Sequence, residues 1–139
     1  MKDSAAVVQN NVIYNIGGYP SSQSVLWCSL ASNDPPNWKS MELQNHSFKG
    51  YCVREAFAVG NKIVYFGCYN HNATFVLEKE EEEEKLRVVR QDEGFNFSMS
   101  YNPGSCVFKK EIYAFENENY TKVHRYSLET GKWNLYYEQ

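Results

Sequence analysis

One short apolar run occurs three times in this chain of 139 residues, at nearly constant spacing. The runs align on Ile13, Ile63 and Ile112, so they recur after 50 and then 49 residues. Their sequences are VIYNIGG (Val12 to Gly18), KIVYFGC (Lys62 to Cys68) and EIYAFEN (Glu111 to Asn117). No unit shows a helical periodicity over about ten residues or more, so the repeat is one of short strands rather than of paired helices.

Each unit divides into four predicted strands. In the first unit they cover Ala5 to Val8, Val12 to Ile16, Val25 to Leu30 and Trp38 to Leu43. In the second unit they cover Arg54 to Val59, Ile63 to Phe66, Thr74 to Glu78 and Leu86 to Arg90. In the third they cover Ser105 to Phe108, Ile112 to Phe115, Val123 to Leu128 and Trp133 to Tyr137. A four-stranded unit of this length is typical of a β-propeller blade.

The tight turns support the same division. Gln9-Asn10-Asn11 joins the first two strands of the first unit, and asparagine tolerates the positive φ that such hairpins need. Gly60-Asn61 and Lys109-Lys110 occupy the matching places in the other two units.

The first unit resembles the kelch repeat. Gly17-Gly18 follows an apolar strand, Val25-Leu26-Trp27 forms a hydrophobic third strand, and Trp38 lies further on. Glycines suit this place because blades crowd near the propeller axis, where a missing side chain lets backbones approach or adopt left-handed angles.

The other two units depart from the kelch pattern. The second keeps Gly67 but has Cys68 for the next glycine, and Val88 or Val89 stands where a tryptophan is expected. The third has Glu116 and Asn117 in place of both glycines but keeps Tyr126 and Trp133. The lost glycines predict a looser contact there.

The resemblance implies an all-β fold, a sector of a kelch-like propeller with three four-stranded antiparallel blades. It implies one domain over residues 1–139, with blades at about 4–44, 51–92 and 100–139. It further implies a non-enzymatic protein-interaction or scaffold module, the usual work of cytosolic kelch proteins, with cytoskeletal, axonemal or regulatory proteins all open as partners. No BTB or F-box segment is present, so a role in ubiquitin ligation is not carried over.

Charge and hydropathy narrow the classes of partner. The formal net charge is -3 and there is no basic cluster, so we expect no nucleic-acid partner. The N-terminus lacks the apolar run of a signal peptide, and no stretch of 18 apolar residues occurs, so we expect a soluble cytoplasmic chain without a membrane partner. Four glycosylation sequons begin at Asn45, Asn72, Asn96 and Asn119 and are the main argument for a secreted alternative.

The cysteines give no metal pattern. Cys28, Cys52, Cys68 and Cys106 form no CxxC pair, so no zinc site is expected. Each lies in or beside an apolar segment, and we expect four buried free thiols.

Hairpin geometry predicts one binding face. It puts the loops between second and third strands on the same side as the connections between blades. These loops are rich in Tyr, Asn and Ser, which suits protein recognition. The candidate partner-binding residues are Tyr19, Ser22, Gln23, Tyr51, Arg54, Tyr69, Asn70, His71, Asn119 and Tyr120. The alternative is that they are ordinary turn residues.

Two tryptophans and one acidic run are best explained by their places in the blades. Trp38 and Trp133, on outer strands, should fill the widening space between adjacent blades. The acidic run Glu80 to Glu84 should form an extended, solvated loop on the opposite face, with an acidic docking patch as the alternative.

The sequence contains little that would support catalysis. No hydrolase, phosphate-binding or HExxH motif occurs, and His46, His71 and His124 pair with no nucleophile, so we expect no enzyme, cofactor or metal. The alternative is a secreted or redox propeller enzyme of the galactose-oxidase type, which the kelch resemblance brings with it.

The number of blades predicts a partner. Closed propellers have about four to eight blades, so three leave two open flanks with apolar surface. We expect another chain or additional sequence to complete the ring, because the third unit's lost glycines argue against a symmetric closure. A homodimer of six blades comes second.

Overall fold

The computed structural model describes residues 4–17, 24–31, 35–44, 55–66, 73–80, 85–94, 104–116 and 122–138. These segments form three four-stranded antiparallel sheets, here called blades 1 to 3. Blade 1 consists of β1 (Ala5–Gln9), β2 (Val12–Ile16), β3 (Ser24–Ser29) and β4 (Lys39–Glu42). Blade 2 consists of β5 (Glu55–Val59), β6 (Lys62–Phe66), β7 (Ala73–Lys79) and β8 (Leu86–Glu93). Blade 3 consists of β9 (Ser105–Phe108), β10 (Glu111–Phe115), β11 (Lys122–Ser127) and β12 (Lys132–Glu138).

The predicted all-β architecture is confirmed, strand by strand. Each sheet pairs its strands in sequence order, first to second, second to third and third to fourth. The described residues contain no helix long and apolar enough to cross a membrane.

The short turns have the predicted backbone. Asn10 and Asn11 have φ of 51° and 61°, Gly60 has φ of 60°, and Gly17 at the end of β2 has φ of 76°. All lie in the left-handed region that asparagine and glycine tolerate best. Lys109 and Lys110 also lie there, at φ 49° and 65°, although a lysine gains nothing from this conformation.

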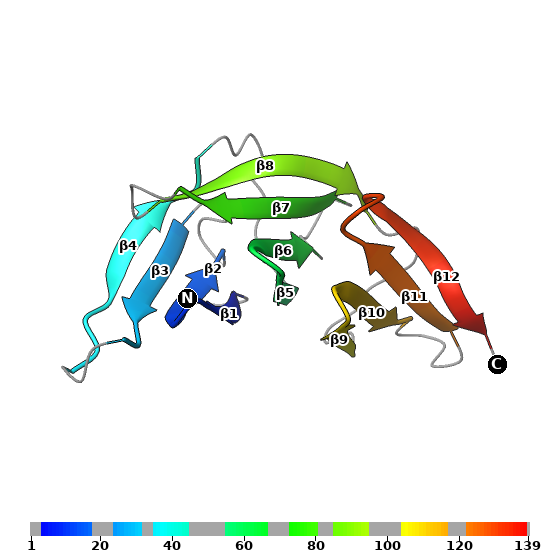
Figure 1. Ribbon diagram of the computed structural model, residues 1–139, viewed down its shortest axis with the longest axis horizontal. Helices are drawn as coiled ribbons and strands as arrows, with labels where there is room; N and C mark the ends of the chain where they lie inside the picture. Colours follow the sequence, from blue (N-terminus) through cyan, green and yellow to red (C-terminus); the bar gives the residue numbers. More distant parts are fainter. Residues whose placement is uncertain are drawn as a thin grey trace.

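The blades are arranged in an arc (Figure 1). The first strands β1, β5 and β9 lie on its concave side, and the last strands β4, β8 and β12 lie on its convex side. The chain runs from blade 1 at one end of the arc to blade 3 at the other, so only blade 2 has a neighbour on both sides.

Blades 1 and 2 share one apolar core. Alternate residues of β2, among them Tyr14 and Ile16, pack with Ile63, Tyr65 and Phe75 of blade 2. Gln9 adds a polar link, because its side-chain amide donates to the carbonyls of Gly60 (3.2 Å) and Lys62 (2.9 Å). After β4 the chain pairs with the outer edge of β8, where Gln44 N donates to Leu86 O (3.0 Å) and Val88 N donates to Gln44 O (2.9 Å).

Blades 2 and 3 share a second core, in which Trp133 has the predicted role. Its ring meets Phe66 edge to face at 5.2 Å, and its Nε1 donates to Thr74 Oγ1 at 2.8 Å. Phe66 and Thr74 belong to blade 2, so Trp133 fills the space between the blades. Buried Ile112, Ala114 and Tyr126 complete the blade 3 side of this core.

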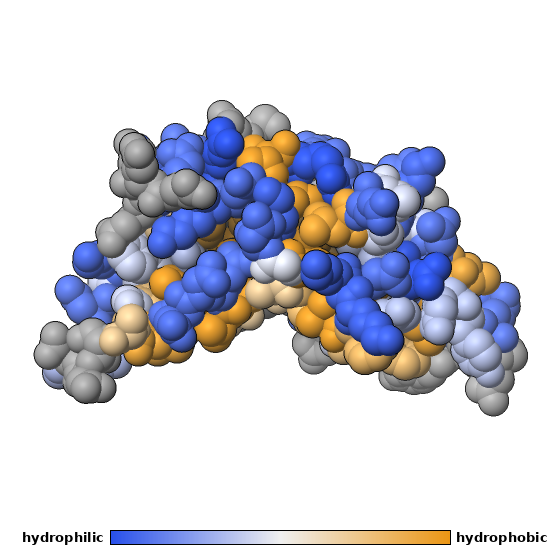
Figure 2. Space-filling view, in the orientation of Figure 1, coloured by the Kyte–Doolittle hydropathy of each residue, from blue (hydrophilic) through white to orange (hydrophobic). Residues whose placement is uncertain are grey.

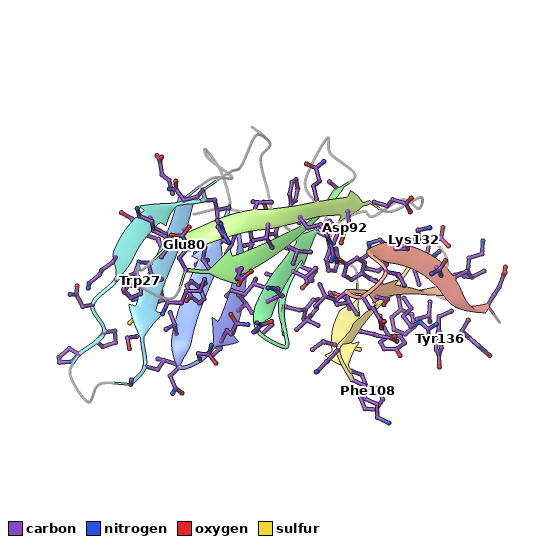
Figure 3. The ribbon with its side chains drawn as sticks, turned by 45° about the horizontal axis from the view of Figure 1, so that its top comes forward. Trp27, Glu80, Asp92, Phe108, Lys132 and Tyr136 are labelled. Atoms are coloured by element: carbon purple, nitrogen blue, oxygen red, sulfur yellow. The ribbon has the colours of Figure 1, made fainter. Side chains whose placement is uncertain are left out.

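A polar cluster closes the same junction near the end of β8 (Figure 3). Arg90 binds the Asp92 carboxylate through two bonds, of 2.7 and 2.8 Å, and also donates to the carbonyl of Leu128. Tyr126 Oη donates to Asp92 Oδ2. Burial, together with the hydrogen bond to Asp92, raises the pKa of Tyr126, so the phenol stays protonated as a donor.

Gly131 makes room for this cluster. A Cβ there would lie 2.8 Å from Asp92 Oδ1, and the residue has φ of 69°. Any side chain would therefore meet both backbone strain and the carboxylate.

Candidate interaction surfaces

One edge of the arc carries all the connections that the sequence assigns to the binding face. Because the strands alternate in direction, β2, β6 and β10 end at the edge where β3, β7 and β11 begin. β4 and β8 end at that same edge, where the next blade starts. The strand ends that flank segments 18–23, 45–54, 67–72, 95–103 and 117–121 therefore lie at one edge, here called the loop face.

All ten candidate partner-binding residues belong to those segments and lie outside the described residues. They are Tyr19, Ser22, Gln23, Tyr51, Arg54, Tyr69, Asn70, His71, Asn119 and Tyr120. Their assignment to the loop face stays a prediction, based on where the described strands end.

Charged residues of blade 3 lie at the rim of the loop face. Glu116 Oε2 is 3.7 Å from His124 Nε2 and 3.9 Å from Lys122 Nζ, and Lys122 is also 3.9 Å from Glu138. Burial lowers the pKa of His124, while the Glu116 carboxylate opposes that effect. A neutral His124 at physiological pH leaves this rim with two carboxylates and one ammonium group.

Sequence reasoning missed the pairing of Glu116 with His124. The two residues are eight positions apart, on either side of the β10–β11 connection. The register Ala114↔His124 brings them together. The sequence did contain a signal for this pair. Once Ala114 is aligned with His124 in the hairpin, Glu116, two residues later, must lie near the start of the partner strand.

Glu80, the first residue of the acidic run, lies at the edge opposite the loop face. Glu80 N donates to Lys85 O at 3.0 Å, so the β7–β8 hairpin continues one pair beyond the strands. Glu81 to Glu84 lie outside the described residues. Near this hairpin, a small hollow between blades 1 and 2 is lined by Val12, Tyr14, Trp27, Met41, Lys79 and Lys85.

The two ends of the arc expose apolar side chains. Figure 2 shows apolar residues gathered along the concave lower edge of both limbs. Phe108 on blade 3 is 60% exposed and extends away from the rest of the chain (Figure 3). Val8 and Leu30 on blade 1 are exposed as well, as are Phe115, Tyr136 and Tyr137 on blade 3.

Two predictions of burial are wrong, for the same reason. Trp38 is 50% exposed instead of filling a space between blades. It lies on the side of blade 1 that faces away from blade 2, where the described chain supplies no neighbour. Cys106 is also exposed, because it pairs with Tyr113 on the outer side of blade 3. Cys28 is buried as expected, and Cys52 and Cys68 lie outside the described residues.

The described residues hold no group of three or more His, Cys, Asp or Glu side chains placed to bind a metal ion.

Together, three four-stranded antiparallel blades in an arc define a sector of a β-propeller. A solved structure described as "Structure of YjhT" is similar to this chain, with a TM-score of 0.68 and 10% sequence identity. The match covers 99% of this chain and 52% of that one, so the chain spans about half the length of the structure it matches. At this identity the likeness shows the fold alone. No family model and no curated protein matches the chain.

Proposed function

We propose that this chain is a non-enzymatic protein-interaction module of the kelch type that binds a protein partner through its loop face. The observation that carries the proposal is the topology, in which every connection between second and third strands and between blades leaves from one edge. Such an edge gathers loops from three separate blades into one continuous surface.

The composition of these loops supports recognition rather than catalysis. Tyr19, Tyr69 and Tyr120 come one from each blade, and tyrosine supplies large contact area at low entropic cost. The charged residues Glu116, Lys122 and Glu138 lie at the blade 3 end of this face, and a polar rim beside aromatic residues is common in interfaces. Additional blades, from another chain or from further sequence, would extend this face without altering it.

The first test replaces two of these tyrosines. Tyr69→Ala and Tyr120→Ala should each weaken partner binding by about 1 kcal/mol or more, because central aromatic residues dominate interface energies. The melting temperature should change little. Affinity purification with mass spectrometry on the intact chain identifies the partner, and titration of that purified partner measures each loss.

The matched control lies at the other edge of blade 2. Replacement of Glu81 to Glu84 by glutamine keeps the length of the β7–β8 connection and should leave binding and melting temperature unchanged. A partner lost with this replacement but kept by both tyrosine variants would move the binding site to the acidic hairpin. An equal loss of stability in the tyrosine variants would instead make them core residues.

A further inference from the structure

The outer sides of blades 1 and 3 carry side chains at the positions that elsewhere form the contact between neighbouring blades. The first-blade flank is the side of blade 1 that faces away from blade 2, and it includes Val8, Ile13, Cys28, Leu30 and Trp38. Its residues alternate with Val12, Tyr14 and Ile16, which pack against blade 2. The third-blade flank is the outer side of blade 3, and it includes Phe108, Tyr113, Phe115, Tyr136 and Tyr137. It alternates with Ile112 and Ala114 in the same way.

Trp38 occupies the register position of Trp133. Trp133 pairs with Tyr126, which pairs with Ile112. In blade 1, Ile13 pairs with Cys28, and the pairing of Trp27 with Lys39 puts Trp38 opposite Cys28. Ile13 and Ile112 are the aligned isoleucines of the repeat, so the two tryptophans stand at equivalent places on equivalent faces.

Phe115 occupies the register position of Phe66. Each is the third residue after its aligned isoleucine, and each points towards the next blade along the chain. Phe66 is fully buried and in contact with Trp133, whereas Phe115 is 41% exposed because the described chain places no blade against it. A Trp38 placed on Phe115 would repeat the aromatic contact between blades 2 and 3. Val123 pairs with Phe115 where Thr74 pairs with Phe66, so the indole hydrogen bond would not be repeated.

The last residues of the first strands also show that the outer side of blade 3 is equivalent to a side that is covered in the other blades. Gln9, Val59 and Phe108 each end the first strand of a blade, and the first two are buried against the following blade. Only Phe108, at the open end, is exposed.

Few charges lie on the two flanks. The first-blade flank residues named above are uncharged, and Glu42, opposite Ser24, lies on the same side at the end of β4. On the third-blade flank Arg125 lies 3.5 Å from Glu111 and stacks over the Tyr136 ring at 5.0 Å, and Lys132, opposite Ser127, lies on the same side. Docking would leave the Arg125–Glu111 pair intact and so avoid isolating either charge, which is the costly case.

Glu116, which replaces the first of the two lost glycines, does not obstruct this flank. Its carboxylate lies near His124 and Lys122, on the side of blade 3 that faces blade 2. Asn117, which replaces the second, lies outside the described residues.

We propose that the occupant of both flanks is a second copy of this chain. The first-blade flank of each copy would meet the third-blade flank of the other, so that two copies related by a two-fold axis close a ring of six blades. Six lies within the usual range of about four to eight. Two copies also supply about the length of the solved structure that one copy half covers. Each ring then contains two equal contacts between Trp38 and Phe115.

The test is the mass of the intact chain in solution, measured by sedimentation equilibrium over a range of concentrations. The wild-type chain should sediment at twice 16.2 kDa. Trp38→Glu and Phe115→Glu should each raise the dimer dissociation constant at least about tenfold, because each variant places a charge in both contacts. Val89→Glu, at an exposed apolar residue of the middle blade, should remain a dimer.

Mixing the two flank variants tests the head-to-tail geometry. An equimolar mixture of Trp38→Glu and Phe115→Glu chains should form a two-chain species, because one of its two contacts is unaltered. A wild-type monomer, an open polymer, or a mixture that stays monomeric although both variants give wild-type circular dichroism would each overturn the proposal. The flank variants leave Tyr69 and Tyr120 unchanged, so loss of the dimer and loss of a loop-face partner are separate outcomes.

Discussion

Two lysines at the first turn of blade 3 adopt a backbone conformation that suits neither of them. Lys109 and Lys110 have φ of 49° and 65°, values close to those of Asn10 and Asn11 at the matching turn of blade 1. A non-glycine residue in the left-handed region costs roughly 1 kcal/mol, and asparagine less than most. The fold of the repeat therefore imposes this turn on blade 3 against local preference.

Replacement of these lysines should stabilise the protein. Lys109→Asn combined with Lys110→Gly should raise the free energy of unfolding by about 1 kcal/mol, because Asn-Gly is the preferred pair for such turns. Urea unfolding at fixed protein concentration measures the change. The reciprocal variant, Asn10→Lys with Asn11→Lys in blade 1, should lower the free energy by a similar amount. Unchanged stability in both variants would show that the turn geometry is wrong.

At the scale of the strands and blades, identical positions have different environments. Trp133 is packed between two blades, and Trp38, at the same register, faces outwards. The contribution of each tryptophan to the free energy of unfolding thus depends on whether another blade packs against the side of the blade on which it lies.

This difference predicts unequal costs of truncation. Trp133→Ala should lower the free energy of unfolding by about 3 kcal/mol, because it removes a large ring from a core and leaves Thr74 without its donor. Trp38→Ala should change it by less than about 0.5 kcal/mol. Both are compared in the Phe115→Glu background, so that self-association does not contribute. Similar costs for the two variants would contradict the placement of Trp38 on an open flank.

The sequence predicted the strands and turns well because their signals are local. Alternating apolar residues, the pair Asn10-Asn11 and the spacing of the aligned isoleucines all act within a few residues. Burial of Trp38 could not be predicted in this way, because it depends on a neighbouring blade rather than on its own strand. The link from Asp92 to Tyr126 spans 34 residues and has no local signal. The candidate loop-face residues lie outside the described segments, so they remain predictions.

For the whole molecule, an arc of three blades separates two kinds of surface. The loop face is the edge at which β2, β4, β6, β8 and β10 end, whereas the flanks are apolar sides of the two end sheets. An open arc is also less compact than a single globule of the same length. A compact chain of 139 residues has a radius of gyration of about 14 Å.

Small-angle X-ray scattering from the Phe115→Glu chain tests the arc most directly, because this variant should be monomeric. The radius of gyration should exceed about 14 Å, and the scattering curve should match that of the open arc in Figure 1. A curve that fits a compact globule of about 14 Å would contradict the arrangement of three blades in an open propeller sector.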